Sequence, residues 1–286
     1  MSAAVAWMLV SGLCFAASGA FAKAASADYG PVELMLYRCA FIVLAIAVYA
    51  RAAGLVLRTR LWGAHFARSA AGVSSLLFFL YCLSQAPLST AVTLNYTSPL
   101  FLALITGLVL REHVPPLAVA AIVLGFVGVV VLLQPGGAEV PLLAGLSGLA
   151  GGAVSALAYL GIRRLGAAGE PEWRTVFYFA LLGLLTGLPA LPWLGASLPP
   201  LADLPLLLAV GASALGAQLA MTAAYARGPT LVAATLSYSG VLFAALIDVV
   251  LWRQVPAASG WIGMIAIVAA GVMTVLARRP AAPPRR

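Results

Sequence analysis

The sequence predicts an all-α integral membrane protein with ten transmembrane helices, arranged as two five-helix repeats of inverted topology. Only 8% of the residues are charged and 63% are hydrophobic, whereas a soluble domain has about 25% charged residues because its surface faces water. The apolar residues form unbroken blocks such as FIVLAIAVYA, where a transmembrane strand would alternate apolar and polar residues. One polar pattern also occurs twice, as LNYTSPLF at 94–101 and LSYSGVLF at 236–243.

The ten helices are the apolar blocks that remain between clusters of proline, glycine and arginine. A helix needs about 20 apolar residues to cross the hydrocarbon core. Several blocks have a proline at or near the first turn, where the missing N–H costs little. In chain order, the predicted helices are 3–22, 31–50, 69–85, 88–110, 115–134, 141–162, 173–195, 203–226, 229–251 and 256–277.

The distribution of basic residues predicts the orientation. Loops rich in Lys and Arg stay in the cytoplasm. With a cytoplasmic N-terminus, thirteen of the sixteen basic residues lie on the inner side, while Lys23 and Arg253 lie outside and Arg38 lies within a span. We therefore expect a multi-pass protein of a bacterial inner membrane with both termini in the cytoplasm. The inner residues are Arg51, Arg58, Arg60, Arg68, Arg111, Arg163, Arg164, Arg174, Arg227, Arg278, Arg279, Arg285 and Arg286.

An internal repeat supports the inverted topology. Shifting the chain by 142 residues aligns 87–111 with 229–253, and eleven of these twenty-five positions are identical, among them Tyr96 with Tyr238. Because each copy has an odd number of helices, the copies cross the membrane in opposite directions, as in secondary transporters with a substrate site between the halves. The predicted units are 1–136 for the first repeat, 137–277 for the second, and 278–286 for a basic cytoplasmic tail.

The chain also resembles a known family in its motifs. The stretches GPVELMLYRCAF and SPLFLALITGLVLREHVPPLAVAAIVLGFVGVVVLL, with Pro99 and the Arg111-Glu112 pair, are similar to the EamA-domain signature of the drug/metabolite transporter superfamily. The second copy, GVLFAALIDVVLWRQVPAASGWIGMIAIVAAGV, departs from it at Val241 and Gln254. The resemblance implies two EamA repeats around a central cavity formed mainly by helices 1, 3, 4, 6, 8 and 9. It also implies transport of amino acids, other metabolites or nucleotide-like solutes, with the ten-helix amino-acid exporters of the YddG type as a suggested match.

Polar side chains on these helices are candidates for substrate binding, since a polar group in hydrocarbon needs a partner or water. Helical spacing places them in stripes on helices 1, 3, 6 and 8, and the remainder lie in the two repeated motifs. Packing between helices is the alternative for each, and it is favoured for the small residues. The candidates are Trp7, Ser11, Phe78, Tyr81, Gln85, Asn95, Tyr96, Pro99, Ser155, Tyr159, Gln218, Thr222, Tyr225 and Tyr238.

Three charged residues in or near the spans are candidates for gating or coupling. Arg38 can bind a carboxylate as a fork of donors, or it can snorkel or pair with Glu33 or Asp28. Asp248 can couple a proton, form a salt bridge to Arg253, or cap a helix at the outer side. Glu33, near the start of the second helix, can likewise take part in coupling or have a structural role.

The lining predicts a secondary transporter that exports small amphipathic metabolites, most simply amino acids, by alternating access. Aromatic, amide and hydroxyl groups with little fixed charge suit neutral or zwitterionic solutes. A multidrug or nucleotide-like solute transporter is the alternative, and a channel or sensor stays open. An intramembrane enzyme is a remote alternative, because the sequence has no HExxH, GxSxG or paired acids on a helix face.

Other partners are not expected. The absence of a GxxxxGK[ST] motif argues against ATP hydrolysis as the motor. We predict no cofactor, no metal site and no catalytic residue. The basic residues are scattered without interleaved aromatics, so we expect no nucleic acid. The expected partners are the lipid bilayer and a small-molecule substrate, and we expect a monomer.

Overall fold

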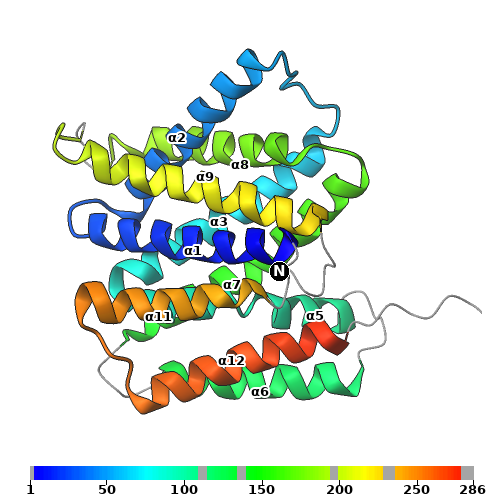
Figure 1. Ribbon diagram of the computed structural model, residues 1–286, viewed down its shortest axis with the longest axis vertical. Coiled ribbons are helices and arrows are strands. Elements are labelled where there is room, and N and C mark those ends of the chain that lie inside the picture. Colours follow the sequence, from blue (N-terminus) through cyan, green and yellow to red (C-terminus); the bar gives the residue numbers. More distant parts are fainter. Residues whose placement is uncertain (1–2, 109–114, 134–139, 194–198, 228–235, 278–286) are drawn as a thin grey trace, which may run out of the picture.

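The computed structural model describes residues 3–108, 115–133, 140–193, 199–227 and 236–277, and within these ranges every regular element is helical (Figure 1). Eight of the described helices are long and apolar enough to cross a membrane, and the apolar helix Ser239–Trp252 is shorter. The helices are α1 (Ala3–Ala25), α2 (Pro31–Ala52), α3 (Trp62–Gln85), α4 (Leu88–Asn95), α5 (Ser98–Leu108), α6 (Pro116–Leu133), α7 (Leu142–Ala167), α8 (Glu172–Gly187), η1 (Leu188–Ala190), α9 (Leu204–Arg227), α11 (Ser239–Trp252) and α12 (Ala258–Ala277).

The sequence pattern predicted that the third helix begins at residue 69, but it begins at Trp62. The sequence pattern places His65 and Arg68 in the loop before the third helix, but both side chains are buried in helix packing, at 2% and 5% exposed. The prediction that they lie outside the helix is therefore wrong, and both belong to α3.

The predicted fourth helix is two helices, α4 and α5, separated by a turn at Tyr96 and Thr97. The matching place in the second half is also a turn, at Tyr238, directly before α11. The predicted seventh helix ends early, because α8 stops at Gly187 and the 3₁₀ turn η1 contains Pro189, which cannot donate a backbone hydrogen bond.

Long helices pack in pairs. Figure 1 shows α1 beside α9 and α6 beside α12, and α3 packs in the same way on α7. The α6–α12 pair approaches closely at glycines, since a Cβ on Gly263 would lie 2.8 Å from the carbonyl oxygen of Gly128. Small residues let helices in lipid bring their backbones together, which is how they gain packing energy without a hydrophobic driving force.

The α1–α9 and α3–α7 pairs each contain a serine that donates a hydrogen bond to a backbone carbonyl of the partner helix. Ser11 of α1 donates to the carbonyl oxygen of Ala217 on α9 at 3.0 Å. Ser75 of α3 donates to the carbonyl oxygen of Gly151 on α7 at 2.9 Å. Gly151 follows Ser11 by 140 residues and Ala217 follows Ser75 by 142, so both contacts join positions separated by nearly the 142-residue shift of the sequence repeat.

Candidate functional site

The α1 candidates divide between packing and the surface. The hydroxyl of Ser11 is buried and bonded to α9, as above, and Ser18 likewise donates to the carbonyl oxygen of Val210 at 3.1 Å. These bonds account for both serines as packing contacts. Trp7 is 38% exposed and stays a candidate.

Four of the five candidates on α3 and α7 are at least partly exposed. Phe78 and Tyr159 are 39% and 37% exposed, Gln85 is exposed and Tyr81 is half-buried. Ser155 is buried instead, with its hydroxyl 2.6 Å from that of Ser75. Whether the exposed four face a substrate is still a prediction.

The α9 candidates are described only in part. Gln218 is 9% exposed and so is buried within the bundle. Thr222 and Tyr225 belong to α9, but their side chains lie outside the part of the chain that the structure describes. The predicted tail, 278–286, lies outside it as well.

The two repeated motifs meet at their helix breaks. The rings of Tyr96 and Tyr238 lie 5.5 Å apart, and the Tyr238 hydroxyl lies 3.4 Å from the carbonyl oxygen of Tyr96, to which it donates. Each ring rests on a glycine of the second half. A Cβ on Gly240 would lie 2.9 Å from the Tyr96 hydroxyl, and a Cβ on Gly271 would overlap the Tyr238 hydroxyl.

The break at Tyr96 follows from the local sequence. Pro99 has no N–H to donate to the carbonyl oxygen of Asn95, where a regular helix would place a bond. The amide of Leu100 donates to Thr97 at 2.9 Å instead of to the Tyr96 carbonyl that a regular helix would use. A backbone carbonyl directed away from the helix is tolerated in a membrane only where protein or water satisfies it, and here the Tyr238 hydroxyl does so.

Asp248 caps a helix from the other half of the chain. Its carboxylate, which has no exposed surface, accepts the backbone N–H groups of Leu88 at 3.0 Å and Ser89 at 2.6 Å, at the start of α4. Lys23 lies near enough to attract this carboxylate, and its ammonium donates to the carbonyl oxygen of Ala86 at 2.6 Å. Of the roles left open for Asp248, the structure shows the cap.

Glu33 and Arg38 lie on the same helix without pairing. The Glu33 carboxylate accepts the N–H of Gly30 at 2.8 Å and so caps α2. This contact explains its position, and coupling stays a prediction. Arg38 is 7% exposed, and the buried Nε of its guanidinium has no hydrogen-bond partner in the described part of the chain.

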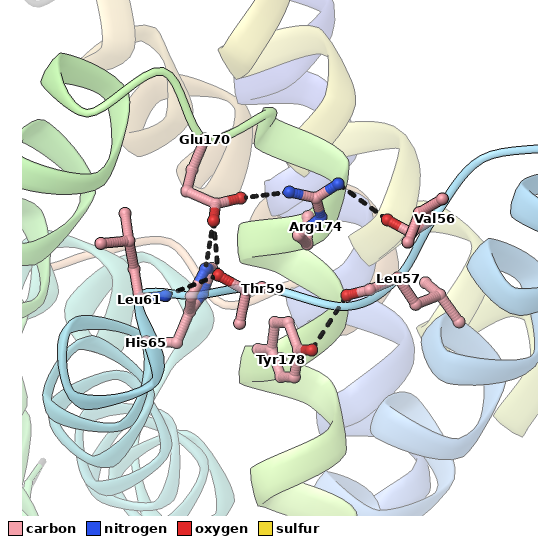
Figure 2. Close-up of polar contacts among 8 residues, drawn as sticks. All are labelled: Val56, Leu57, Thr59, Leu61, His65, Glu170, Arg174 and Tyr178. Carbon is pink, nitrogen blue, oxygen red and sulfur yellow. Dashed lines mark hydrogen bonds and ion pairs between the residues drawn. The ribbon is translucent and has the colours of Figure 1, made fainter.

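A polar cluster fastens the α2–α3 loop to the start of α8, and we call it the loop latch: Thr59, Glu170, Arg174 and Tyr178 (Figure 2). Glu170 accepts the Thr59 hydroxyl at 2.5 Å and an Arg174 Nη at 2.7 Å. The other Arg174 Nη donates to the carbonyl oxygen of Val56 at 2.7 Å, and Tyr178 donates to that of Leu57 at 2.9 Å.

Charge holds the loop latch together. Burial on its own raises the pKa of Glu170, but hydrogen bonds from Thr59 and Arg174 and the nearby charges outweigh it, so the pKa lies below its usual value. His65 stands 3.7 Å from the same carboxylate and adds an attractive charge when it is protonated. The ionised form of Glu170 is therefore the one that holds the loop.

A smaller bond ties the α1–α2 loop to the start of α9. The Tyr29 hydroxyl donates to the carboxylate of Asp203 at 2.5 Å. This hydrogen bond, followed by burial, raises the pKa of Tyr29 to about 12. We call the pair the Tyr29 latch. The Tyr29 latch joins the α1–α2 loop to the α8–α9 loop, and the loop latch joins the α2–α3 loop to the α7–α8 loop. The predicted repeat would place the two latches at equivalent positions.

Sequence comparison finds similarity to known transporters. The model of the EamA-like transporter family matches residues 2–134. Relatives extend the similarity over nearly the whole chain: the pseudopaline exporter CntI of Pseudomonas aeruginosa is 28% identical over 263 residues, covering 92% of each chain. The first part of the chain therefore matches the EamA-like transporter family. The transporters among its relatives and its apolar helices together indicate a multi-pass membrane transporter.

Other relatives of this chain are also transporters by name. The riboflavin transporter of Vibrio cholerae is 29% identical, covering 92% of this chain and 89% of its own. The human solute carrier family 35 member G1 is 25% identical, covering 93% and 77%. A solved protein crystal structure shares the fold, with a TM-score of 0.69, 21% identity and coverage of 97% and 98%.

The loop latch as a whole and the burial of Arg68 could not be predicted from the sequence. Glu170 precedes Arg174 by four residues, a spacing that brings side chains together on a helix, so this pair was visible as a signal. Its partners Thr59 and His65 lie more than a hundred residues away in the chain, and no local pattern indicates that contact.

Proposed function

We propose that this protein exports small amphipathic metabolites, with amino acids as the first candidates, by alternating access. The transport class follows from the relatives and the apolar helices, and the solute is the step that we add. The region around the helix breaks and the candidate stripes carries tyrosines, hydroxyls and amides and few charges. Such groups satisfy the polar ends of a solute and cover its apolar part.

The proposed moving parts are two inverted repeats, residues 1–136 and 137–277. The serine-to-carbonyl hydrogen bonds between α1 and α9 and between α3 and α7 support this division into two repeats. A second pair of contacts agrees: Gly12 of α1 lies against the hydroxyl of Ser239, and Gly152 of α7 lies against the hydroxyl of Thr97. Each glycine seats its helix against the broken helix of the other half, at positions separated by 140 and 142 residues.

The paired helix breaks are the observation that carries the proposal. Secondary transporters with inverted repeats bind solutes where helices are interrupted near the bilayer midplane. Here both interruptions fall at the shared tyrosine, and the two tyrosines contact each other. A solute that inserts between Tyr96 and Tyr238 would replace this contact and couple its own binding to the position of the two halves.

The two latches match the gates that alternating access requires. With the predicted orientation, the loop latch lies on the cytoplasmic side and the Tyr29 latch on the outer side. One must open while the other stays closed. Both depend on a carboxylate, Glu170 or Asp203, that accepts a hydroxyl, so each can break and re-form without moving a charge through the bilayer.

A second candidate solute class comes from the relatives. A riboflavin transporter and a pseudopaline exporter are similar to this chain over nearly its full length. A larger ring-bearing or nucleotide-like solute would use the same aromatic lining. The liposome experiment described next also tests the multidrug alternative and the direction of transport.

Transport by purified protein in liposomes tests the proposal. Counterflow is measured for the twenty L-amino acids, riboflavin and two cationic drugs, with protein-free liposomes as the control. We expect saturable counterflow of at least one amino acid, reduced by Tyr96→Ala and Tyr238→Ala. Saturable flux of riboflavin or a drug alone would reject the amino-acid assignment.

We also propose that the chain acts as a monomer in a bacterial inner membrane with both termini in the cytoplasm. Labelling tests the orientation. Single cysteines replace Arg60 or Arg253 in a background without other cysteines. A maleimide that cannot cross the membrane should label position 253 in intact cells and position 60 only after lysis. The reverse pattern would invert the topology.

A further inference from the structure

A buried arginine at one end of α3 is not used by either latch. Arg68 lies six residues after the start of α3 at Trp62, which is about 9 Å along a helix. It is 5% exposed. A Cβ on Gly161 of α7 would lie 2.7 Å from the Cβ of Arg68, so the stem of the side chain is held against α7.

The guanidinium points into the bundle, away from the nearer end of the helix. Helical side chains leave the backbone tilted toward the N-terminus, which for Arg68 is the short way out of the membrane. Long cations near a helix end usually extend outward to water. Here Nη1 lies one turn deeper, 3.2 Å from the position of a Cβ on Gly72, and the guanidinium stacks on the ring of Phe179 at 4.5 Å.

This cation has no anion among the residues that the structure describes. Nε and Nη1 are buried and make no hydrogen bond. The buried carboxylate at this end, Glu170, is already bonded to Thr59 and Arg174. Stacking on Phe179 offsets part of the cost of burying the charge, but it leaves in-plane donors without acceptors.

We propose that Arg68 binds the carboxylate of the transported solute. A guanidinium presents donors in a planar fork that matches a carboxylate, and an ionisable group inside a membrane span with no protein partner marks a solute path. Phe179 and the half-exposed Tyr159, which lies near enough to interact with the Arg68 charge, would cover the apolar part. The inference rests on the proposed function and narrows it to solutes that carry a carboxylate.

Two measurements test Arg68, one of them independent of transport. Thermal unfolding of the purified protein is followed with sodium benzoate and, at equal ionic strength, with benzamide, which has the same shape without the charge. Liposome flux is compared for L-amino acids and their α-amides. The variants are Arg68→Gln and Arg68→Lys, with Arg164→Gln, an exposed arginine on α7, as the control for loss of one charge.

We expect benzoate to stabilise the wild type more than benzamide, and Arg68→Gln to abolish that difference. Flux of the amino acid should fall about 10- to 100-fold in Arg68→Gln, which corresponds to losing a hydrogen bond to a charged group, while Arg164→Gln is unchanged. If Arg68→Gln does not fold, Arg68→Lys decides: weaker stabilisation by benzoate supports the site, and unchanged stabilisation overturns it.

The outcomes separate this site from the proposed function. Equal stabilisation of the wild type by benzoate and benzamide, or a folded Arg68→Gln that keeps its preference for carboxylates, overturns the assignment of Arg68 even if transport is found. Absence of saturable flux for every solute, with the benzoate effect intact, supports the carboxylate site and rejects the proposed transport of these solutes.

Discussion

Replacing Asp248 with alanine removes the cap that α11 provides for the first turn of α4. Two buried backbone N–H groups, those of Leu88 and Ser89, lose the carboxylate that accepts them at 3.0 and 2.6 Å. An unsatisfied buried donor costs about 1–3 kcal/mol, and loss of an N-cap costs about 0.5–2 kcal/mol. We expect a loss of about 3 kcal/mol in the free energy of unfolding.

For a chain of this size, about 2 °C is lost for each kcal/mol, so we expect the midpoint of thermal unfolding in detergent to fall by about 6 °C. Asp248→Asn, which keeps one acceptor, should lose about half as much. Val250→Ala, on the exposed face of the same helix, is the control. A shift for Asp248→Ala no larger than that of Val250→Ala would refute the capping role. An equal loss in Arg253→Gln would favour a salt bridge instead.

Three further predictions concern the helix breaks at Tyr96 and Tyr238, the loop latch, and the exposed candidate Gln85 on α3. Tyr238→Phe removes the donor to the Tyr96 carbonyl. We expect flux in liposomes to fall severalfold, while the free energy of unfolding changes by about 1 kcal/mol or less. Unchanged flux would contradict the role of the helix break in transport. The pKa of Glu170 is lowered, so the stability that ionised Glu170 contributes is complete above about pH 4.5 and is lost as the pH falls through the folded-state pKa. The difference in the midpoint of thermal unfolding between wild type and Glu170→Gln should therefore shrink below that pH. A difference that stays constant with pH would contradict the role of ionised Glu170. Gln85→Ala should lower flux without lowering membrane abundance, whereas a parallel loss of both would identify Gln85 as a packing residue.

Much of the architecture could be predicted from local pattern and composition. Apolar blocks set the spans because a membrane helix must bury its backbone in its own hydrogen bonds. The repeated motif singled out Tyr96 and Tyr238, but both were predicted inside continuous helices, and the breaks there are found only in the structure. The predicted helix bounds are wrong where polar residues are buried inside the bundle. The sequence pattern starts the third helix after His65 and Arg68, because nothing near them in the chain shows that α7, α8 and Glu170 lie against them.

The sequence by itself determined that this protein is built of membrane helices and that residues 87–111 resemble residues 229–253, because composition, periodicity and motif spacing are local or self-comparing properties. Only the tertiary structure decided which polar groups satisfy one another. Asp248 caps a helix that begins 160 residues earlier, and Tyr238 donates to a carbonyl 142 residues away. Hydrogen bonds depend on distance in space, and the fold alone brings such residues together.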